Sequence, residues 1–563
     1  MLDIKKYFSE NEIIHFVAKL RAKSAKDVHD NQFLRNVSKL ARKPFNPNKR
    51  KDIYDFVPPR NCWIRLKKHE RTKYNDSLQI NTVQIERSVK KYRSKVKRNE
   101  IDEPKWHKKL NSFIEDIQNS VINEDYEIDT PELIPQIKDK KKNTYRPICL
   151  FSLKDRFIIS QTARYFTCLF DPLFYNNSYA FREQKPGQLF NHHKAVEDII
   201  NYRKKANTRI YAAECDIKKF YDSISHDTII SCFNSLKDEL IKKGAGIDEI
   251  AEKIFFKYLE CYTFNHTVYQ NQKQLLENKG IHNGEIPWVE EQELCRVKSD
   301  PKNDKIGVPQ GGALSCLIAN IVLHFADKKI ISGNYRKLFY ARFCDDMILL
   351  HTNKKQCQRA FDDYIDSLKS LKLIEHQPED YKKYSKEFWG IKTKKPYVWG
   401  KNNPSHRLAK KNVPWVAFVG YQVRYDGIVR IRKSSLIKEL NKQVIETNKV
   451  LKSIYEKSAV KVNKRALKFR FMQRLISMSV GRLNNDGQSL CWTSGFRVLK
   501  NHKCLKSQLR KLDRNRAKQI ARLKNKISHL GDSGKKSSQD IRVLPYYGGN
   551  YSYYHQFVNK KDE

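Results

Sequence analysis

The stretch YARFCDDMILL, residues 340–350, places two adjacent aspartates, Asp345 and Asp346, between two apolar runs. Short apolar runs of this kind predict β-strands, and a tight turn between them would present both carboxylates at the end of a sheet. Neighbouring negative charges repel each other, so such a pair favours the binding of cations. Aspartate is also common in ordinary turns, where its side chain bonds nearby backbone. The segments that accompany the hairpin therefore decide its meaning.

The first accompanying segment is RIYAAECDIKKFYDSISHD, residues 209–227. Its apolar start predicts a strand with Asp216 near its end, and Ser225 is a suitable cap for the helix that follows. Asp216 is expected to meet Asp345 and Asp346 across adjacent strands. Carboxylate oxygens are hard ligands that suit Mg²⁺ or Mn²⁺. Two such ions, roughly 4 Å apart, would hold the attacking and leaving oxygens of a phosphoryl transfer.

The second accompanying segment is GVPQGGALSCLIANIVLHFAD, residues 307–327. Its glycines let backbone approach a ligand closely around Pro309 and Gln310. The helix predicted after them carries an apolar face. The members of this face are Leu314, Leu317, Ile318, Ile321 and Phe325.

The chain has 563 residues and a net charge of +47, which favours a polyanion, and nucleic acid in particular, as its partner. Residues 431–530 contain 26 Lys or Arg against 5 Asp or Glu, a difference of +21, with apolar residues at helical spacing. A basic helical region with a nucleic-acid-binding face is therefore expected there. Its apolar stripe comprises Ile437, Leu440, Val444, Leu451 and Ile454.

Several protein classes fit the sequence poorly. The first residues, MLDIKKYFSE, contain no apolar core of a secretory signal. No apolar run reaches the ~18 residues of a membrane span. Twelve cysteines occur without a C-x-x-C pair, which argues against a structural zinc site and against a disulfide framework. A cytoplasmic protein with reduced thiols and no membrane partner is expected.

Taken together, these segments resemble the reverse transcriptases, in matching order over about residues 140–430. AAECDIKKFYDSI is similar to motif A of that family, GVPQGGALSCLIANIVL to motif B and YARFCDDMILL to motif C. NTYRPICLFSLKDRFIISQTA and SYAFREQKPGQ are similar to its finger motifs, and WVAFVGYQVRYDGIVRIR to its primer grip. The resemblance implies an RNA-directed DNA polymerase of α+β class with a right-hand architecture of fingers, palm and basic helical thumb.

The resemblance also implies roles for individual residues. Asp216 and Asp345 would be the main ligands of two Mg²⁺ ions, with Mn²⁺ as the alternative. Asp346 would complete the triad, and the backbone carbonyl of Ile217 would add a ligand. Lys392 or Lys394 would donate a proton to pyrophosphate, and the sequence leaves the choice between them open.

Four further residues are implied to contact the nucleotide. Arg146 would contact the triphosphate, with one more surface cation as the alternative. Tyr221 would stack under the sugar and exclude a 2′-hydroxyl, with ordinary core packing as the alternative. Gln310 and Gly311 would lie near the nucleotide. The sequence departs from the family pattern at Cys344, where alanine is usual, and at Cys316, where proline is usual.

The expected domains are an N-terminal extension with fingers over residues 1–207, a palm over 208–430 and a basic helical thumb over 431–530, followed by a linker and aromatic tail over 531–563. The palm contains an insertion at about 230–305. Its acidic stretch NGEIPWVEEQE, residues 283–293, is expected to be a solvated loop.

Within the family, the downstream segment and the long basic C-terminus look most like the bacterial unknown-group and abortive-infection enzymes. That resemblance implies antiphage defence with a structured non-coding RNA, and dNTPs and DNA product as the other partners. A group II intron or retron enzyme and a maturase-like RNA-binding protein remain alternatives, and a homo-oligomer is left open. A tyrosine of the tail would be a candidate protein primer, with aromatic packing as the alternative; these are Tyr546, Tyr547, Tyr551, Tyr553 and Tyr554.

Overall fold

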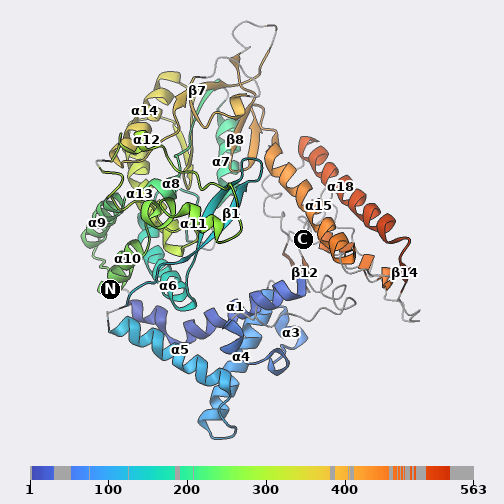
Figure 1. Ribbon diagram of the computed structural model, residues 1–563. Helices are drawn as coiled ribbons and strands as arrows, with labels where there is room; N and C mark the ends of the chain where they lie inside the picture. Colours follow the sequence, from blue (N-terminus) through green and yellow to red (C-terminus); the bar gives the residue numbers. More distant parts are fainter. Residues whose placement is uncertain are drawn as a thin grey trace. The chain divides into compact units, whose positions relative to one another are not determined.

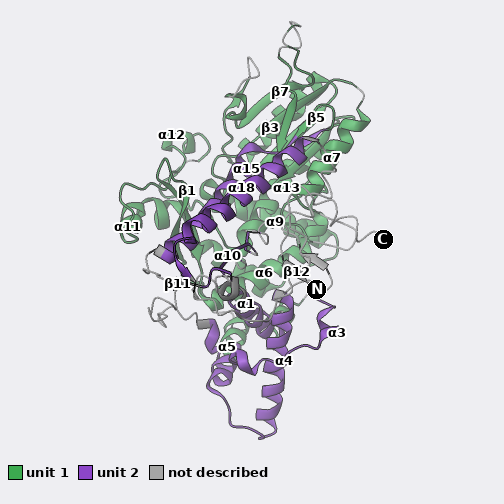
Figure 2. Cartoon of the chain, turned by 90° about the vertical axis from the view of Figure 1, so that its right-hand side faces the viewer, with its two compact units in different colours: residues 1–9, 115–419, 423–427 green, residues 10–114, 420–422, 428–563 purple. Residues whose placement is uncertain are grey.

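The chain divides into two compact units in the computed structural model (Figure 2). Unit 1 comprises residues 1–9, 115–419 and 423–427, and unit 2 comprises residues 10–114, 420–422 and 428–563. The residues that the structure describes are 3–30, 52–74, 77–123, 126–183, 190–206, 208–298, 300–380, 387–403, 405, 411–455, 461–465, 467–468, 471–472, 474–475, 482–484, 487–489 and 503–532.

In the described part of unit 1, five strands form one sheet in the order β4-β5-β3-β7-β6; Figure 1 labels its strand β7. The pairs are antiparallel except for β6 with β7. The central strands β3 and β5 are mostly apolar and mostly buried on both faces of the sheet, as expected of strands covered by helices; Glu214, Asp346 and His351 are their polar members. The strands are β3 (Ile210–Cys215), β4 (Phe339–Phe343), β5 (Asp346–His351), β6 (Pro378–Glu379) and β7 (Thr393–Trp399).

Helix α13 (Ala313–Ser332) is the centre of the unit 1 core. It packs against α6 (Leu153–Phe170), α9 (His226–Lys242) and α14 (Lys354–Ser370), and α14 also covers β3, β5 and β7. Buried residues surround α13 on every side, Asn320 included, so the expectation of a single apolar face was too narrow. The predicted cap of α9 is confirmed, because the side chain of Ser225 accepts a hydrogen bond from the backbone N–H of Thr228.

A two-stranded antiparallel hairpin, β1 (Glu132–Asp139) with β2 (Thr144–Leu150), carries Arg146 toward the sheet. It is bound to the Gly-rich loop of residues 307–312, because the backbone N–H of Cys149 donates to the carbonyl of Gln310 at 2.9 Å. This bond fixes one edge of the hairpin beside the loop.

The remaining elements of unit 1 are short helices and one strand. They are η1 (Ile4–Phe8), η5 (Asp171–Leu173), α7 (His192–Lys205), α8 (Phe220–Ser223), α10 (Glu249–Glu260), η6 (Phe264–Tyr269), α11 (Gln272–Glu277), α12 (Glu291–Leu294), η7 (Glu387–Trp389) and β8 (Trp415–Phe418).

Unit 2 is dominated by helices. Two of them, α15 (Lys433–Tyr455) and α18 (Lys503–Ile527), pack against each other around buried residues such as Val450 and Leu523. The other helices are α1 (Glu10–Asp30), η3 (Asp52–Asp55), η4 (Arg60–Cys62), α3 (Lys68–Arg71), α4 (Ser77–Lys97) and α5 (Lys105–Ile122). The strands are β9 (Tyr421–Arg424), β10 (Val429–Ile431), β11 (Lys461–Val462), β12 (Arg482–Asn484), β13 (Gly487–Ser489) and β14 (Gly531–Asp532). Both α5 and β9 cross the boundary between the units.

The helix predicted from the stripe in residues 431–455 exists, but its buried face is rotated from the predicted one. Leu451 and Ile454 are buried, whereas Ile437 is 43% exposed. The buried positions include Gln443, whose side chain bonds the backbone of α18 at Leu512, at 3.3 Å. A search for regularly spaced apolar residues does not detect a polar residue that is buried through a hydrogen bond. The sequence pattern therefore predicted the wrong buried face for α15.

The predicted α+β class is confirmed, and the small sheet that was expected to carry the carboxylates is present. The finger, palm and thumb boundaries stay predictions.

A substitution at Gly307 would test how closely the Gly-rich loop of residues 307–312 packs against its neighbours. Its φ is +91°, and an added Cβ would lie 2.5 Å from the Cβ of Phe264. Gly244 has a φ of +77° but open space around it. We expect Gly244→Ala to cost about 1–2 kcal/mol from backbone conformation alone, and Gly307→Ala to cost clearly more. Thermal melting of the two variants measures the difference, and equal midpoints would contradict the close packing.

Candidate active site

The register of the central strands brings three carboxylates together. Cys215 at the end of β3 pairs with Met347 of β5, which places Asp216 opposite Asp346. Asp345 occupies the turn between β4 and β5, because Phe343 pairs with Asp346 across that hairpin. All three aspartates line one cavity of about 870 Å³. The convergence that the sequence predicted is therefore observed.

The hairpin turn requires an unusual backbone conformation. Cys344 has a φ of +57°, in the left-handed region that non-glycine residues seldom adopt. Its Sγ lies 3.2 Å from the hydroxyl of Tyr221. Burial raises the pKa of the Tyr221 phenol well above its ordinary value, so the hydroxyl stays protonated. The departure from alanine at Cys344 thus supplies a contact to a residue predicted to lie under the nucleotide sugar.

A buried arginine braces the same turn from behind. Arg342 of β4 is 0% exposed and donates from Nη1 to the carbonyl of Cys344 at 3.0 Å. Its Nη2 donates to Asp327 Oδ2 at 2.6 Å and to Ser178 Oγ at 2.9 Å, and its Nε donates to Asp327 Oδ1 at 2.8 Å. Asp327, on α13, is also 0% exposed and accepts a bond from Tyr340 at 2.5 Å. The paired charges fix the turn relative to α13.

The carboxylates influence each other electrostatically. Burial, followed by the charges of Asp345 and Asp216, raises the pKa of Asp346 to about 7. Burial and the charge of Asp216 also raise the pKa of Asp345. Both shifts reflect negative charge confined in a poorly solvated site, which a bound cation would relieve.

The predicted nucleotide contacts line the same cavity, namely Arg146, Tyr221, Gln310 and Gly311. Gln310 is oriented by Asp222, because its Nε2 donates to Asp222 Oδ1 at 2.5 Å. Burial raises the pKa of Asp222 to about 6. Sequence reasoning missed Asp222, although it lies within the same DIKKFYDSI segment as Asp216.

A cationic wall faces this cavity. It consists of Lys138 and Arg146 from the β1–β2 hairpin together with Lys219, which follows strand β3. Burial lowers the pKa of Lys219 to about 8, and the neighbouring cations Lys138 and Arg146 lower it further against the influence of Asp222. The cavity thus combines carboxylates with a basic wall, an arrangement suited to cations on one side and phosphates on the other.

Residues 137–377 match the family model described as reverse transcriptase (RNA-dependent DNA polymerase). These residues are a reverse transcriptase domain. The match confirms the predicted enzyme class at the level of this domain.

More distant likenesses accompany the domain. An uncharacterized 91 kDa protein in the cob intron of Schizosaccharomyces pombe is 27% identical over 197 residues, which are 34% of this chain and only 18% of that protein. Telomerase from Candida albicans with a telomeric RNA fragment aligns at 13% identity over 72% of this chain and 62% of its own, with a TM-score of 0.32. Apo telomerase from Candida tropicalis aligns at 11% identity over 88% and 80%, with a TM-score of 0.33. These scores are too low to define a shared fold.

The donor set of the reverse transcriptase domain fits hard divalent cations, since carboxylate oxygens converge beside the backbone of Ile217 in one cavity. Their side chains are not arranged as a closed coordination shell: within the described residues, no group of three or more His, Cys, Asp or Glu has that geometry. Instead, Lys392 Nζ lies 2.6 Å from Asp216 Oδ2. A lysine therefore neutralises the carboxylate that a metal ion would share, and the predicted metal roles stay predictions.

The structure separates the two lysines that the sequence left as alternatives. Lys392 is 59% exposed at its side chain and lines the cavity. Lys394 is only 6% exposed at its side chain, pairs with Glu214 at 2.5 Å and does not line the cavity. Of the two lysines, only Lys392 lines the cavity. His376, which sequence reasoning missed, also lines the cavity, with Nε2 at 3.9 Å from Asp216 Oδ2.

The acidic stretch of the insertion, residues 283–293, is not a solvated loop. Ile286 and Val289 are 1% and 6% exposed, and Trp288 forms part of the cavity wall. The abundance of glutamates suggested solvent, but the apolar residues between them point into the core.

Two other predicted features have different outcomes. The tail tyrosines lie outside the described residues, so their priming role stays a prediction; they are Tyr546, Tyr547, Tyr551, Tyr553 and Tyr554. In the described part of the chain, no helix combines the length and apolar character needed to cross a bilayer.

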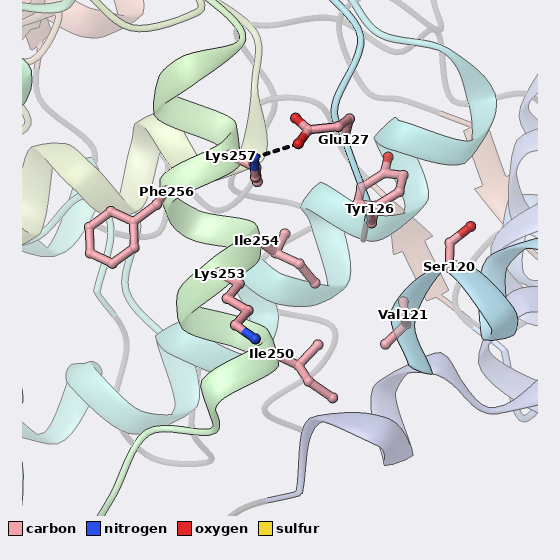
Figure 3. A pocket seen from close by; sticks show the side chains of 9 residues that line it. All are labelled: Ser120, Val121, Tyr126, Glu127, Ile250, Lys253, Ile254, Phe256 and Lys257. Carbon is pink, nitrogen blue, oxygen red and sulfur yellow. Dashed lines mark hydrogen bonds and ion pairs between the residues drawn. The ribbon is translucent and has the colours of Figure 1, made fainter. Parts of the chain in front are cut away.

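A second cavity of about 330 Å³ lies in unit 1 between the end of α5, the chain at Tyr126 and α10 (Figure 3). Lys257 and Glu127 form an ion pair at its rim. Tyr126 donates a hydrogen bond to the buried carboxylate of Asp155. The lining shares no residue with the catalytic cavity.

The ion pair of Arg342 with Asp327, behind the β4–β5 turn, predicts an effect on thermal stability. Arg342→Met leaves the carboxylate of Asp327 buried without its cation, and removal of one partner of a buried pair typically costs about 3–5 kcal/mol. We expect a lower midpoint of thermal unfolding for Arg342→Met. The double variant Arg342→Met, Asp327→Leu removes both charges and should recover part of the loss. Equal destabilisation of the single and double variants would show that the ion pair is not what fixes the turn.

Proposed function

We propose that this protein is an RNA-directed DNA polymerase that extends a primer with deoxynucleotides along an RNA template. The observation that carries the proposal is the convergence of Asp216, Asp345 and Asp346 on one cavity that is also lined by the cations Lys138, Arg146 and Lys219. The match of residues 137–377 to the reverse transcriptase family supports it.

In the proposed reaction, the oxygen of the primer 3′-hydroxyl forms a bond to the α-phosphorus of a dNTP. The bond from that phosphorus to the oxygen bridging to the β-phosphorus breaks, and pyrophosphate leaves with the electron pair. The proton of the hydroxyl passes to water. Two Mg²⁺ ions, when bound, would lower the pKa of the hydroxyl and neutralise charge on the leaving group.

The chain's own residues position the reactants. Asp216, Asp345 and Asp346 would offer their carboxylate oxygens, and the carbonyl of Ile217 would add a ligand. Arg146 and Lys219, which line the same cavity, would hold phosphate oxygens through charge-assisted hydrogen bonds. Lys392 would move from Asp216 when a metal ion takes its place.

Lys392 would then be free to give a proton to the leaving pyrophosphate. Its exposure and its place in the cavity support this role over Lys394, which is engaged with Glu214.

Template and product are bound, in this proposal, through a basic helical surface. Helix α18 buries Leu505, Leu509 and Leu512 along one face. Its other face exposes the cations Arg510, Lys511, Arg514, Lys518, Arg522, Lys524 and Lys526. Such an amphipathic basic helix suits contacts to phosphates, whose affinity falls with salt.

The biological setting is a separate proposal. Antiphage defence in the cytoplasm, with an associated non-coding RNA, is supported by the resemblance of the downstream segment to the abortive-infection enzymes. The name of the fungal relative, a protein in the cob intron, supports an intron-encoded or retron-type enzyme instead. A maturase-like protein that only binds RNA would gain little from three converging carboxylates.

Asp345→Ala provides the central test of the reaction. We expect it to abolish deoxynucleotide incorporation on an RNA template with a DNA primer, because the turn carboxylate is lost while the basic surfaces remain. RNA binding, measured in parallel, should change little. Normal synthesis by this variant would refute the assignment of the carboxylates.

Sequencing of the RNA and DNA that copurify with the wild-type protein, against the Asp345→Ala control, separates the settings. Intron RNA, retron RNA and a dedicated non-coding RNA would be told apart by their sequences. DNA should be present only with the wild-type protein.

Tyr221→Ala tests the predicted selection of the sugar. Loss of the ring opens space for a 2′-hydroxyl, so we expect the preference for dNTPs over rNTPs, measured as a ratio of kcat/KM values, to fall by roughly tenfold or more. Tyr221→Phe keeps the ring and loses only the contact to Cys344, so it should retain most of the preference. An unchanged ratio in Tyr221→Ala would assign the ring to packing alone.

A further inference from the structure

The insertion contains a segment, residues 281–294, that we call the strap. It was expected in solvent, yet it contributes Trp288, Val289, Glu290 and Glu293 to the wall of the catalytic cavity. Its contacts on two sides show what it holds together.

On one side the strap is bound to the β1–β2 hairpin. The backbone N–H of Tyr145 donates to the carbonyl of Glu285 at 2.8 Å, and the N–H of Glu285 donates to the carbonyl of Asn143 at 3.1 Å. The side-chain amide of Asn143 donates to the carbonyl of Asn283 at 2.7 Å. The hairpin that carries Lys138 and Arg146 is thus attached to the strap through backbone.

On the other side the strap is bound to the turn that follows Asp216. Lys218 pairs with Glu293 at 2.5 Å, and Lys219 Nζ donates to the carbonyl of Pro287 at 2.5 Å. The indole N–H of Trp288 donates to the carbonyl of Asp222 at 2.7 Å. Asp222 is the residue whose carboxylate orients Gln310.

Trp288 is held in place by aromatic neighbours as well. Its ring centroid lies 5.3 Å from that of Phe264 and 4.9 Å from that of Tyr269. The indole is only half-buried, and part of it faces the cavity. A ring fixed by a hydrogen bond and two aromatic contacts forms a rigid wall that a ligand cannot easily displace.

The strap contacts the cationic part of the cavity. Lys219, which bonds Pro287, belongs to the same wall as Lys138 and Arg146. In a site that binds a nucleoside triphosphate, this wall takes the phosphates, because guanidinium and ammonium groups pair with phosphate oxygens. The strap therefore lies against the space that the outer phosphates would occupy.

We propose that the strap closes the phosphate end of the nucleotide site, with Trp288 as the residue that limits what can be attached to the terminal phosphate of an incoming dNTP. This inference rests on the proposed polymerase function and adds a specificity-determining residue to it. The strap also fixes the spacing between the hairpin cations and the turn after Asp216.

The test compares natural dTTP with dTTP that carries an aromatic amide on its terminal phosphate, on an RNA template with a DNA primer. The measured quantity is the ratio of the two kcat/KM values. Wild-type protein should discriminate strongly against the bulky nucleotide. Trp288→Ala should reduce the discrimination by about tenfold or more, mainly through a lower KM for the bulky nucleotide.

Trp288→Phe keeps an aromatic ring in the packing with Phe264 and Tyr269, so it guards against failure of the alanine variant to fold. We expect it to give an intermediate ratio, because it loses one ring and the bond to Asp222. Trp106→Ala, in helix α5 and outside the cavity lining, is the matched control and should leave the ratio unchanged.

The outcomes separate the two levels of inference. Normal incorporation of dTTP with wild-type discrimination in both Trp288 variants overturns the role of the strap and leaves the polymerase intact. No incorporation of natural dTTP by the wild-type protein overturns the proposed function, and the role of the strap with it.

Discussion

Mutual repulsion among three carboxylates is the constraint on which the rest of this structure depends. The sheet must hold Asp216, Asp345 and Asp346 at neighbouring strand ends although their charges oppose it; burial first, and then the charges of Asp345 and Asp216, raise the pKa of Asp346. Backbone pairing supplies part of the restraint, and the ion pair between Arg342 and Asp327 supplies another part from inside the core. A fully buried pair is a poor source of net stability. Its value here lies in fixing where the turn at Cys344 points.

The same constraint explains how cations are distributed around the cavity. Lys392 neutralises Asp216 from solvent, whereas Lys394 is committed to the buried Glu214. An exposed lysine exchanges partners at little cost, while a buried one does not. The Lys392 contact can therefore be lost without disturbing the sheet, as the proposed binding of a divalent ion at Asp216 would require. Lys219, Lys138 and Arg146 form a separate basic wall, in which burial first, and then the charges of Lys138 and Arg146, lower the pKa of Lys219.

Local patterns predicted the part of the site that strands and turns determine. The tight turn between two apolar runs sufficed to place Asp345 and Asp346 together at a strand end. The pairing of β3 with β5, which brings Asp216 to them, joins segments far apart in the sequence, so the short strands alone left it a hypothesis. Residues fixed by contacts between distant segments were not predictable in this way. The bond from Gln310 to Asp222 and that from Trp288 to the same residue join positions 66 to 88 residues apart. The buried face of α15 was also misjudged, because Gln443 is buried through a hydrogen bond to α18.

The strap shows why an insertion beside a catalytic centre need not disturb it. Its attachment to the hairpin uses backbone groups of Glu285 and Tyr145, which most sequences can supply. Its attachment to the segment after Asp216 uses the side chains of Trp288 and Glu293, so it depends on the residue type at these two positions. The first kind of contact lets the segment dock, and the second decides which groups face the cavity. In the proposed site, such a segment would shape the phosphate end while the carboxylates, held by their own strands and by Arg342, stay where the sheet places them.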